Sequence, residues 1–205
     1  MKLLSTLIVA TALIAIAASG ACAEGFAIGF KGGVTATSVY GDLSDRYEHK
    51  LCVAGGVFLS VSLSERVGLQ GELLYVRKGA NVSDSDGLAV WLDYVEVPML
   101  VKVSLPVGES FVPNLFVGPA LGFNVRAESG VGDDFENLER YVSDTDVSIV
   151  VGAGFDHQLG GASLVGDIRY EFGLMNVNDE DAFVGDVASQ KNHGIVAMVG
   201  IAFSL

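Results

Sequence analysis

Eight charged side chains stand inside segments that are otherwise apolar or small, and each falls on the polar face of its segment. They are Glu72, Glu96, Lys102, Arg126, Asp156, Asp167, Arg169 and Glu171. Charges shut away from water need opposite charges and hydrogen bonds. This set therefore predicts a charge-paired interior, with a proton or solute path lined by acids as the alternative. Five acids against three bases is the best argument for such a path.

One of these acids should meet a base. Glu72 lies on the segment next to the one that carries Glu96 and Lys102, so we expect Lys102 to contact Glu72 or Glu96 if their depths match.

The remaining acids gather in clusters between the alternating segments, at residues 42–48, 84–86, 128–146 and 179–186. Carboxylate oxygens can bind hard divalent cations, but no cluster has the spacing of a calcium-binding loop. Solvated acidic loops are the simpler interpretation, and we expect no metal or cofactor. A net charge of −13 beside 50% hydrophobic residues is typical neither of a nucleic-acid binder nor of a disordered acidic tail.

An enzyme would need a histidine or serine paired with a carboxylate. The three histidines are His49, His157 and His193. His49 and His193 are expected near one rim and His157 at the opposite strand end, and no spacing identifies a nucleophile. The sequence thus predicts that the protein is not an enzyme.

The segments that carry these residues alternate with a period of two, which is typical of strands with unlike faces. In residues 67–80, Val67, Leu69, Leu73 and Tyr75 share one face, and Gln70, Glu72 and Lys78 share the other. The pattern recurs at residues 26–35, 51–63, 92–105, 114–126, 147–157, 164–174 and 193–205. Eight strands of roughly ten residues are long enough to cross a bilayer when tilted.

The connections are expected to be long after the odd-numbered strands and short after the even-numbered ones. This alternation predicts an all-β, eight-stranded antiparallel up-and-down transmembrane barrel with its long loops outside the cell. Pro98 and Pro119 oppose a regular ladder, since proline has no N–H to donate, and we expect a bulge or local break at each.

Residues 1–23 have the features of a cleaved secretory signal peptide, because Lys2 precedes an apolar run and Ala21 and Ala23 fit a peptidase site. Residues 24–205 would then form the barrel domain. Lipidation of Cys22 is an alternative to cleavage after Ala23. Either route delivers the chain across the inner membrane, and Cys52 is left without a cysteine to pair with.

Five motifs, taken in order, resemble those of the outer-membrane β-barrel domain family of porin-like and PorT-like proteins. They are LQGELLYVRKGA at 69–80, YVEVPMLVKV at 94–103, GPALGF at 118–123, GAGF at 152–155 and DIRYEFGL at 167–174. The resemblance implies an eight-stranded barrel in a Gram-negative outer membrane and implies no particular activity.

These features together predict a monomeric outer-membrane barrel with a structural or surface-interaction role through its acidic loops. Its expected partners are outer-membrane lipid and, at the loops, surface ligands or divalent cations, with no nucleic acid. A narrow porin-like channel for cations or small solutes is the alternative, and an outer-membrane enzyme is the third possibility.

Overall fold

The described part of this chain folds into nine strands. The computed structural model describes residues 25–41, 47–82, 89–105, 107–108, 110–131, 134–137, 142–175 and 190–205. The strands are β1 (Gly25–Gly41), β2 (Tyr47–Ser62), β3 (Val67–Val82), β4 (Ala89–Ser104), β5 (Phe111–Val131), β6 (Asp134–Asn137), β7 (Thr145–Gln158), β8 (Ala162–Gly173) and β9 (Gln190–Ser204). The predicted signal peptide lies outside the described residues, and the described part contains no helix long and apolar enough to span a membrane.

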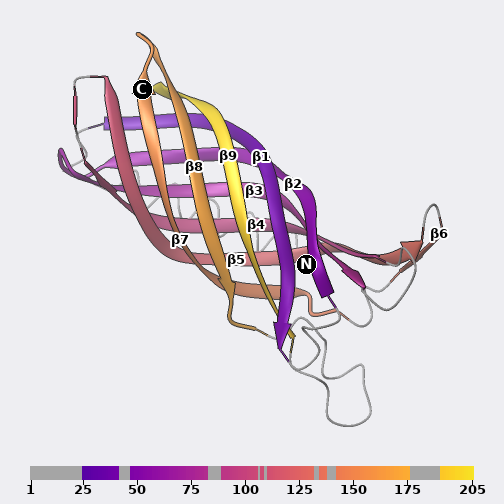
Figure 1. The fold of residues 1–205 in the computed structure, drawn as a ribbon. Coiled ribbons are helices and arrows are strands. Elements are labelled where there is room, and N and C mark those ends of the chain that lie inside the picture. Colours follow the sequence, from indigo (N-terminus) through magenta and orange to yellow (C-terminus); the bar gives the residue numbers. More distant parts are fainter. Residues whose placement is uncertain are drawn as a thin grey trace.

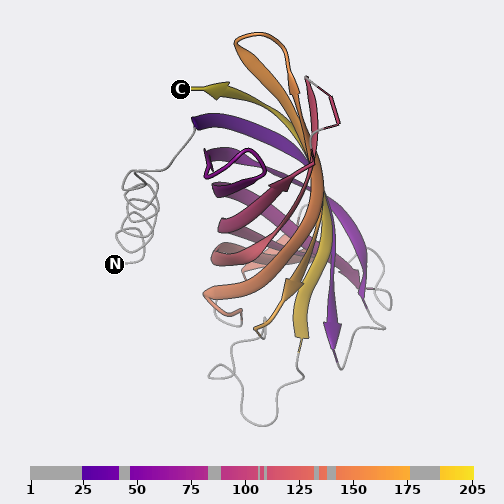
Figure 2. The ribbon, with the colours of Figure 1, turned by 90° about the vertical axis from the view of Figure 1, so that its left-hand side faces the viewer.

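Eight of the strands close into an antiparallel barrel. Each pairs with its neighbour in the chain, β5 pairs with both β4 and β7, and β1 pairs with both β2 and β9. The pairing Ile28↔Phe203 joins the first strand to the last, so no edge of the barrel wall is left unpaired. The wall curls round completely (Figures 1 and 2), while β6 forms a short hairpin with the end of β5, away from the barrel. The predicted fold class is confirmed.

The two faces of the wall differ as the alternation predicts. Large apolar side chains cover the outside, each at least 40% exposed, and include Ile28, Phe30, Val57, Leu69, Leu73, Met99, Val101, Val117, Ile168 and Val199. The inside holds small apolar clusters together with buried charges. An apolar outer face around a closed barrel is the arrangement that lipid requires, because all backbone groups pair within the wall.

The strands are longer than predicted, at 12 to 21 residues in the barrel, and they take up much of the expected loops. β1 continues to Gly41 and β2 begins at Tyr47, for example, where the sequence predicted ends at 35 and 51. The missed β6 lies inside a predicted loop. The period-two apolar pattern marks only the part of each strand that faces lipid. Backbone pairing between neighbouring strands continues beyond that part, through polar residues.

Both prolines interrupt a ladder without shifting its register, as expected. The β3–β4 ladder is continuous up to Gly71↔Met99 and resumes at Leu74↔Glu96, which leaves a gap beside Pro98. The β4–β5 ladder has a similar gap beside Pro119, between Pro98↔Ala120 and Val101↔Val117.

Two further irregularities are register shifts that the sequence did not predict. One lies in β2 between His49 and Ala54. There Thr35 donates to the carbonyl of Arg77 at 2.9 Å, and the Thr37 hydroxyl accepts from the N–H of Gly79 at 3.0 Å. Side chains of β1 thus satisfy backbone groups of β3 across the irregular part of β2. The other shift, in β5, changes which residues face inward and is described with the site.

The outward face gives a direct test of the membrane assignment. We expect Val101→Arg, in the apolar band of β4, to weaken folding into lipid vesicles by about 2 to 4 kcal/mol, because a charge at mid-membrane depth is poorly solvated. Val107→Arg is the matched control, since Val107 is 74% exposed in the β4–β5 turn. Urea unfolding in vesicles measures both, and equal tolerance of the two arginines would contradict a lipid-facing β4.

Candidate functional site: the charged interior

A group of four charges crosses the middle of the barrel from three strands, and we call it the central cluster. Lys31 of β1 contacts Glu72 of β3 at 2.8 Å and Asp167 of β8 at 2.9 Å. Arg169 of β8 contacts Glu72 at 2.8 Å and Asp167 at 2.9 Å. Two bases meet two acids, so the cluster is neutral, and the side chains of Lys31, Glu72 and Arg169 are at most 2% exposed.

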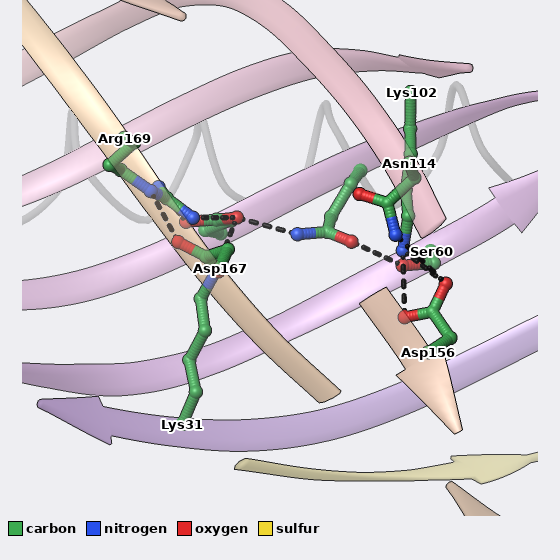
Figure 3. Close-up of polar contacts among 9 residues, drawn as sticks. Lys31, Ser60, Lys102, Asn114, Asp156, Asp167 and Arg169 are labelled. Carbon is green, nitrogen blue, oxygen red and sulfur yellow. Dashed lines mark hydrogen bonds and ion pairs between the residues drawn. The ribbon is translucent and has the colours of Figure 1, made fainter. Parts of the chain in front are cut away.

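Uncharged groups extend this cluster toward the barrel wall. The Gln70 amide donates to Glu72 at 2.6 Å and its carbonyl accepts from the Ser60 hydroxyl at 2.9 Å. Figure 3 shows the chain of contacts from Lys31 and Arg169 toward Ser60. Phe58 lies 5.6 Å from the Lys31 ammonium and Phe116 lies 5.1 Å from the Arg169 guanidinium. The cross-section is therefore filled by paired charges and rings.

A second, more exposed pair lies nearer the end of the barrel that has the short β2–β3, β4–β5 and β7–β8 turns, which we call the short-turn end. Lys102 contacts Asp156 at 2.7 Å, and Asn114 donates to the same carboxylate at 3.3 Å. A small cavity of about 20 Å³, partly open to solvent, lies between this pair and the central cluster. Its lining includes Phe155 and Val165 together with Lys31 and Asp167 of the central cluster.

The third group, the upper cluster, lies toward the opposite end. Lys78 of β3 contacts Glu96 of β4 at 2.7 Å, Glu171 of β8 at 3.4 Å and Asp146 of β7 at 3.7 Å. Asn192 donates to Asp146 at 2.9 Å. Three acids thus surround one base, and all four side chains are at most 6% exposed.

Apolar side chains lie between the upper and central clusters. On β3, Leu74 and Val76 separate Glu72 from Lys78 along the inner face, and they pack with Ala54, Val196 and Met198. A second apolar cluster joins Leu100, Phe116, Ala120 and Val150. The charged groups are therefore separate layers of a filled interior and not one continuous polar path.

Seven of the eight predicted residues point into the barrel, and Arg126 does not. The Arg126 side chain is 54% exposed and pairs at 2.8 Å with Glu128. Asp93 pairs with Arg126 but Tyr94 pairs with Asn124, so Val125 is an extra residue in β5. This bulge reverses the alternation, and Ala127 faces inward where a regular strand would place Arg126. The prediction for Arg126 is wrong for that reason.

The expected contact between Lys102 and Glu72 or Glu96 is also wrong, since Lys102 pairs with Asp156. The predicted set did not include Lys31 and Lys78, the lysines that pair with Glu72 and Glu96. Their inward parity in β1 and β3 could have identified them. Asp146 was assigned to an acidic loop, but β7 begins at Thr145 and places Asp146 inside.

The histidines do not assemble into one site. His157 lies at the short-turn end beside Phe111, with ring centroids 6.3 Å apart. His193 lies on β9 toward the opposite end, 6.2 Å from the ring of Tyr170. The side chain of His49 is outside the described residues. The two described rings belong to opposite ends of the barrel, so they cannot share an active site.

Residues 18–179 match the model of the outer membrane protein beta-barrel domain. The match covers most of the chain, so this protein belongs to that family, and the family implies an outer-membrane location. No curated protein matches the sequence.

Solved barrels with low sequence identity have a similar fold. Neisserial surface protein A superposes with a TM-score of 0.56 at 14% identity, over 89% of this chain and 99% of that one. OprG of Pseudomonas aeruginosa gives 0.49 at 12% identity, over 89% and 97%. The outer membrane protease OmpT of Escherichia coli gives 0.41 at 10%, again over 89% and 97%. At 14% identity, the likeness to Neisserial surface protein A indicates the fold alone.

The central cluster makes a prediction about stability. Glu72→Gln leaves Lys31 and Arg169 to share Asp167, so an uncompensated buried charge remains. We expect a loss of about 3 kcal/mol in the free energy of unfolding. The control Glu128→Gln removes the partner of the exposed Arg126 and should cost about 1 kcal/mol or less. Urea unfolding in vesicles measures both, and a similar small loss for Glu72→Gln would contradict a tightly paired centre.

Proposed function

We propose that this protein is a small, non-enzymatic outer-membrane barrel with a closed interior, which acts through its acidic loops in a structural or surface-interaction role. The observation that carries the proposal is the central cluster. Its paired charges span from β1 and β3 to β8 in the middle of the barrel. A solute that entered would have to separate these buried ion pairs, at a cost of several kcal/mol for each charge left alone.

The loop end supplies what a surface role needs. Acidic residues concentrate in the sequence at 42–48, 84–86, 128–146 and 179–186. Among those that the structure describes, Glu136 and Asp144 are exposed. The β5–β6 hairpin extends away from the barrel (Figure 1). A partner that fits such loops is cationic, either a basic surface or divalent cations, while the apolar wall contacts membrane lipid. Export through residues 1–23 and a monomeric state belong to the same proposal.

A narrow cation channel is the second candidate, because the upper cluster has more acids than bases. Against it, Leu74, Val76 and the neutral central cluster lie between the upper cluster and the short-turn end. Conduction would need both layers to rearrange.

The orientation can be measured with cysteine labelling. We expect a membrane-impermeant maleimide to label Ser143→Cys on intact cells, because Ser143 lies on the loop side. Ser64→Cys, at the exposed short-turn end, is the matched control and should react after permeabilisation. Both are made in a Cys52→Ser background. The reverse pattern in correctly inserted protein would contradict a surface role for the acidic loops.

Conductance tests the closed interior. We expect refolded protein in a planar bilayer to give no sustained current steps, because eight strands leave an interior that side chains fill. A known pore protein in the same bilayer controls for insertion and detection. Stable cation-selective steps that disappear in Glu72→Gln or Glu96→Gln would favour the channel instead.

A further inference from the structure

The upper cluster does not balance its own charge. One ammonium, Lys78, faces three carboxylates, Glu96, Asp146 and Glu171. Fully ionised, the group carries a net charge of −2, whereas the central cluster is neutral. An excess of charge in a buried position is costly unless something compensates it.

The carboxylates also lack hydrogen-bond donors. Four of their oxygens, Glu96 Oε2, Asp146 Oδ1, and both oxygens of Glu171, accept no hydrogen bond from any residue that the structure describes. Glu96 and Glu171 each lie within 3.4 Å of the same Lys78 nitrogen, so their carboxylates converge on one point from opposite walls, β4 and β8.

The groups around this point offer no second positive charge. Facing it among the described residues are Tyr94 beside Glu96 on β4, Asn192 on β9, Thr35 and Thr37 on β1, Ser148 on β7 and Gly122 on β5. Of the other cations, Lys50 of β2 lies over the Trp91 ring at 3.8 Å, and Arg169 is held by Glu72 and Asp167. Water molecules, with two O–H donors each, would satisfy some of the four oxygens but would leave the net charge unchanged.

We propose that the upper cluster is a binding site for a proton, which Glu96 and Glu171 share at neutral pH. The proton is taken from solvent as the barrel folds, and it forms an O–H bond to an oxygen of one carboxyl group. The proton removes one negative charge, and its O–H supplies a donor beside carboxylate oxygens that accept none from the described residues. Because the two acids are coupled, the proton belongs to the pair and not to either residue alone.

The arrangement favours a proton over a metal ion. No group of three or more His, Cys, Asp or Glu side chains in the described part of the chain is arranged to hold a metal. Lys78 already occupies the centre of the three carboxylates. The apolar layer of Leu74 and Val76 lies between this site and the central cluster, so the proton is held in place and not relayed through the barrel.

The wild-type protein gives the first test. In vesicles at pH 7, the infrared spectrum of the wild type should contain the C=O stretch band of a buried protonated carboxyl group. Difference spectra of wild type minus Glu96→Gln, and of wild type minus Glu171→Gln, should show that each variant has lost this band. Glu72→Gln, in the neutral central cluster, is the matched control and should keep the band. A wild-type spectrum without the band overturns the proposal, and it does so whether or not any variant folds.

Stability against pH gives the second test. In the unfolded chain glutamates are ionised above about pH 5. The folded state then binds one proton more than the unfolded state, so the folding constant should fall by up to about tenfold per pH unit until the shared proton is lost. Gln resembles a protonated Glu. Glu96→Gln should therefore match wild type near pH 5 and become increasingly more stable than it as the pH rises.

The control again separates this effect from a general loss of packing. Above about pH 5, where unfolded glutamates are ionised, Glu72→Gln should be less stable than wild type by a constant amount and should keep the wild-type slope. Two results would overturn the shared proton. One is a Glu96→Gln variant that is weaker than wild type at high pH. The other is a wild-type protein that lacks the infrared band and is stabilised by Na⁺ or Ca²⁺ only while Glu96 and Glu171 are both present. That result would assign the site to a metal ion.

Discussion

Closure of only eight strands is the constraint on which the rest of this structure depends. Pairing of β1 with β9 closes the barrel wall, so its strands have no unpaired edge. A barrel of eight strands, however, has an interior just wide enough for side chains. Any charge that points inward must then find its partner across the axis. Lys31, Glu72 and Arg169 meet from three different strands for this reason. The paired centre and the closed lumen are two consequences of the same narrow geometry.

The charged interior is layered, and the ratio of bases to acids differs between its central and upper clusters. At the central cluster two bases meet two acids, and hydrogen bonds from Gln70 and Ser60 complete the shell. At the upper cluster one base meets three acids, and oxygens remain without donors among the described residues. An unequal count of buried charges is the feature that separates a structural layer from a candidate binding site. The apolar side chains between the layers, including Leu74 and Val76, keep the two charged clusters apart along the barrel.

A small number of irregularities decide which residues enter that interior. The bulge at Val125 turns Arg126 to the outside and Ala127 to the inside. The shift in β2 lets Thr35 and Thr37 bond the backbone of β3. In a regular β5 strand Arg126 would have faced inward at the level where Ala127 now packs against Leu92. Backbone geometry thus decides, together with composition, which charges enter the barrel.

The sequence by itself determined the fold class, the number of barrel strands, the outward face and the breaks beside Pro98 and Pro119. Each follows from a local pattern, since alternation with a period of two specifies a two-faced strand and proline lacks a ladder donor. Tertiary structure alone decided the partner of each interior charge, because strand tilt and register set the depth at which residues from distant strands meet. It also excluded Arg126 and placed Asp146 inside. A one-residue bulge reverses every later side chain in its strand, and nothing in the local alternation of β5 marks where that residue is inserted.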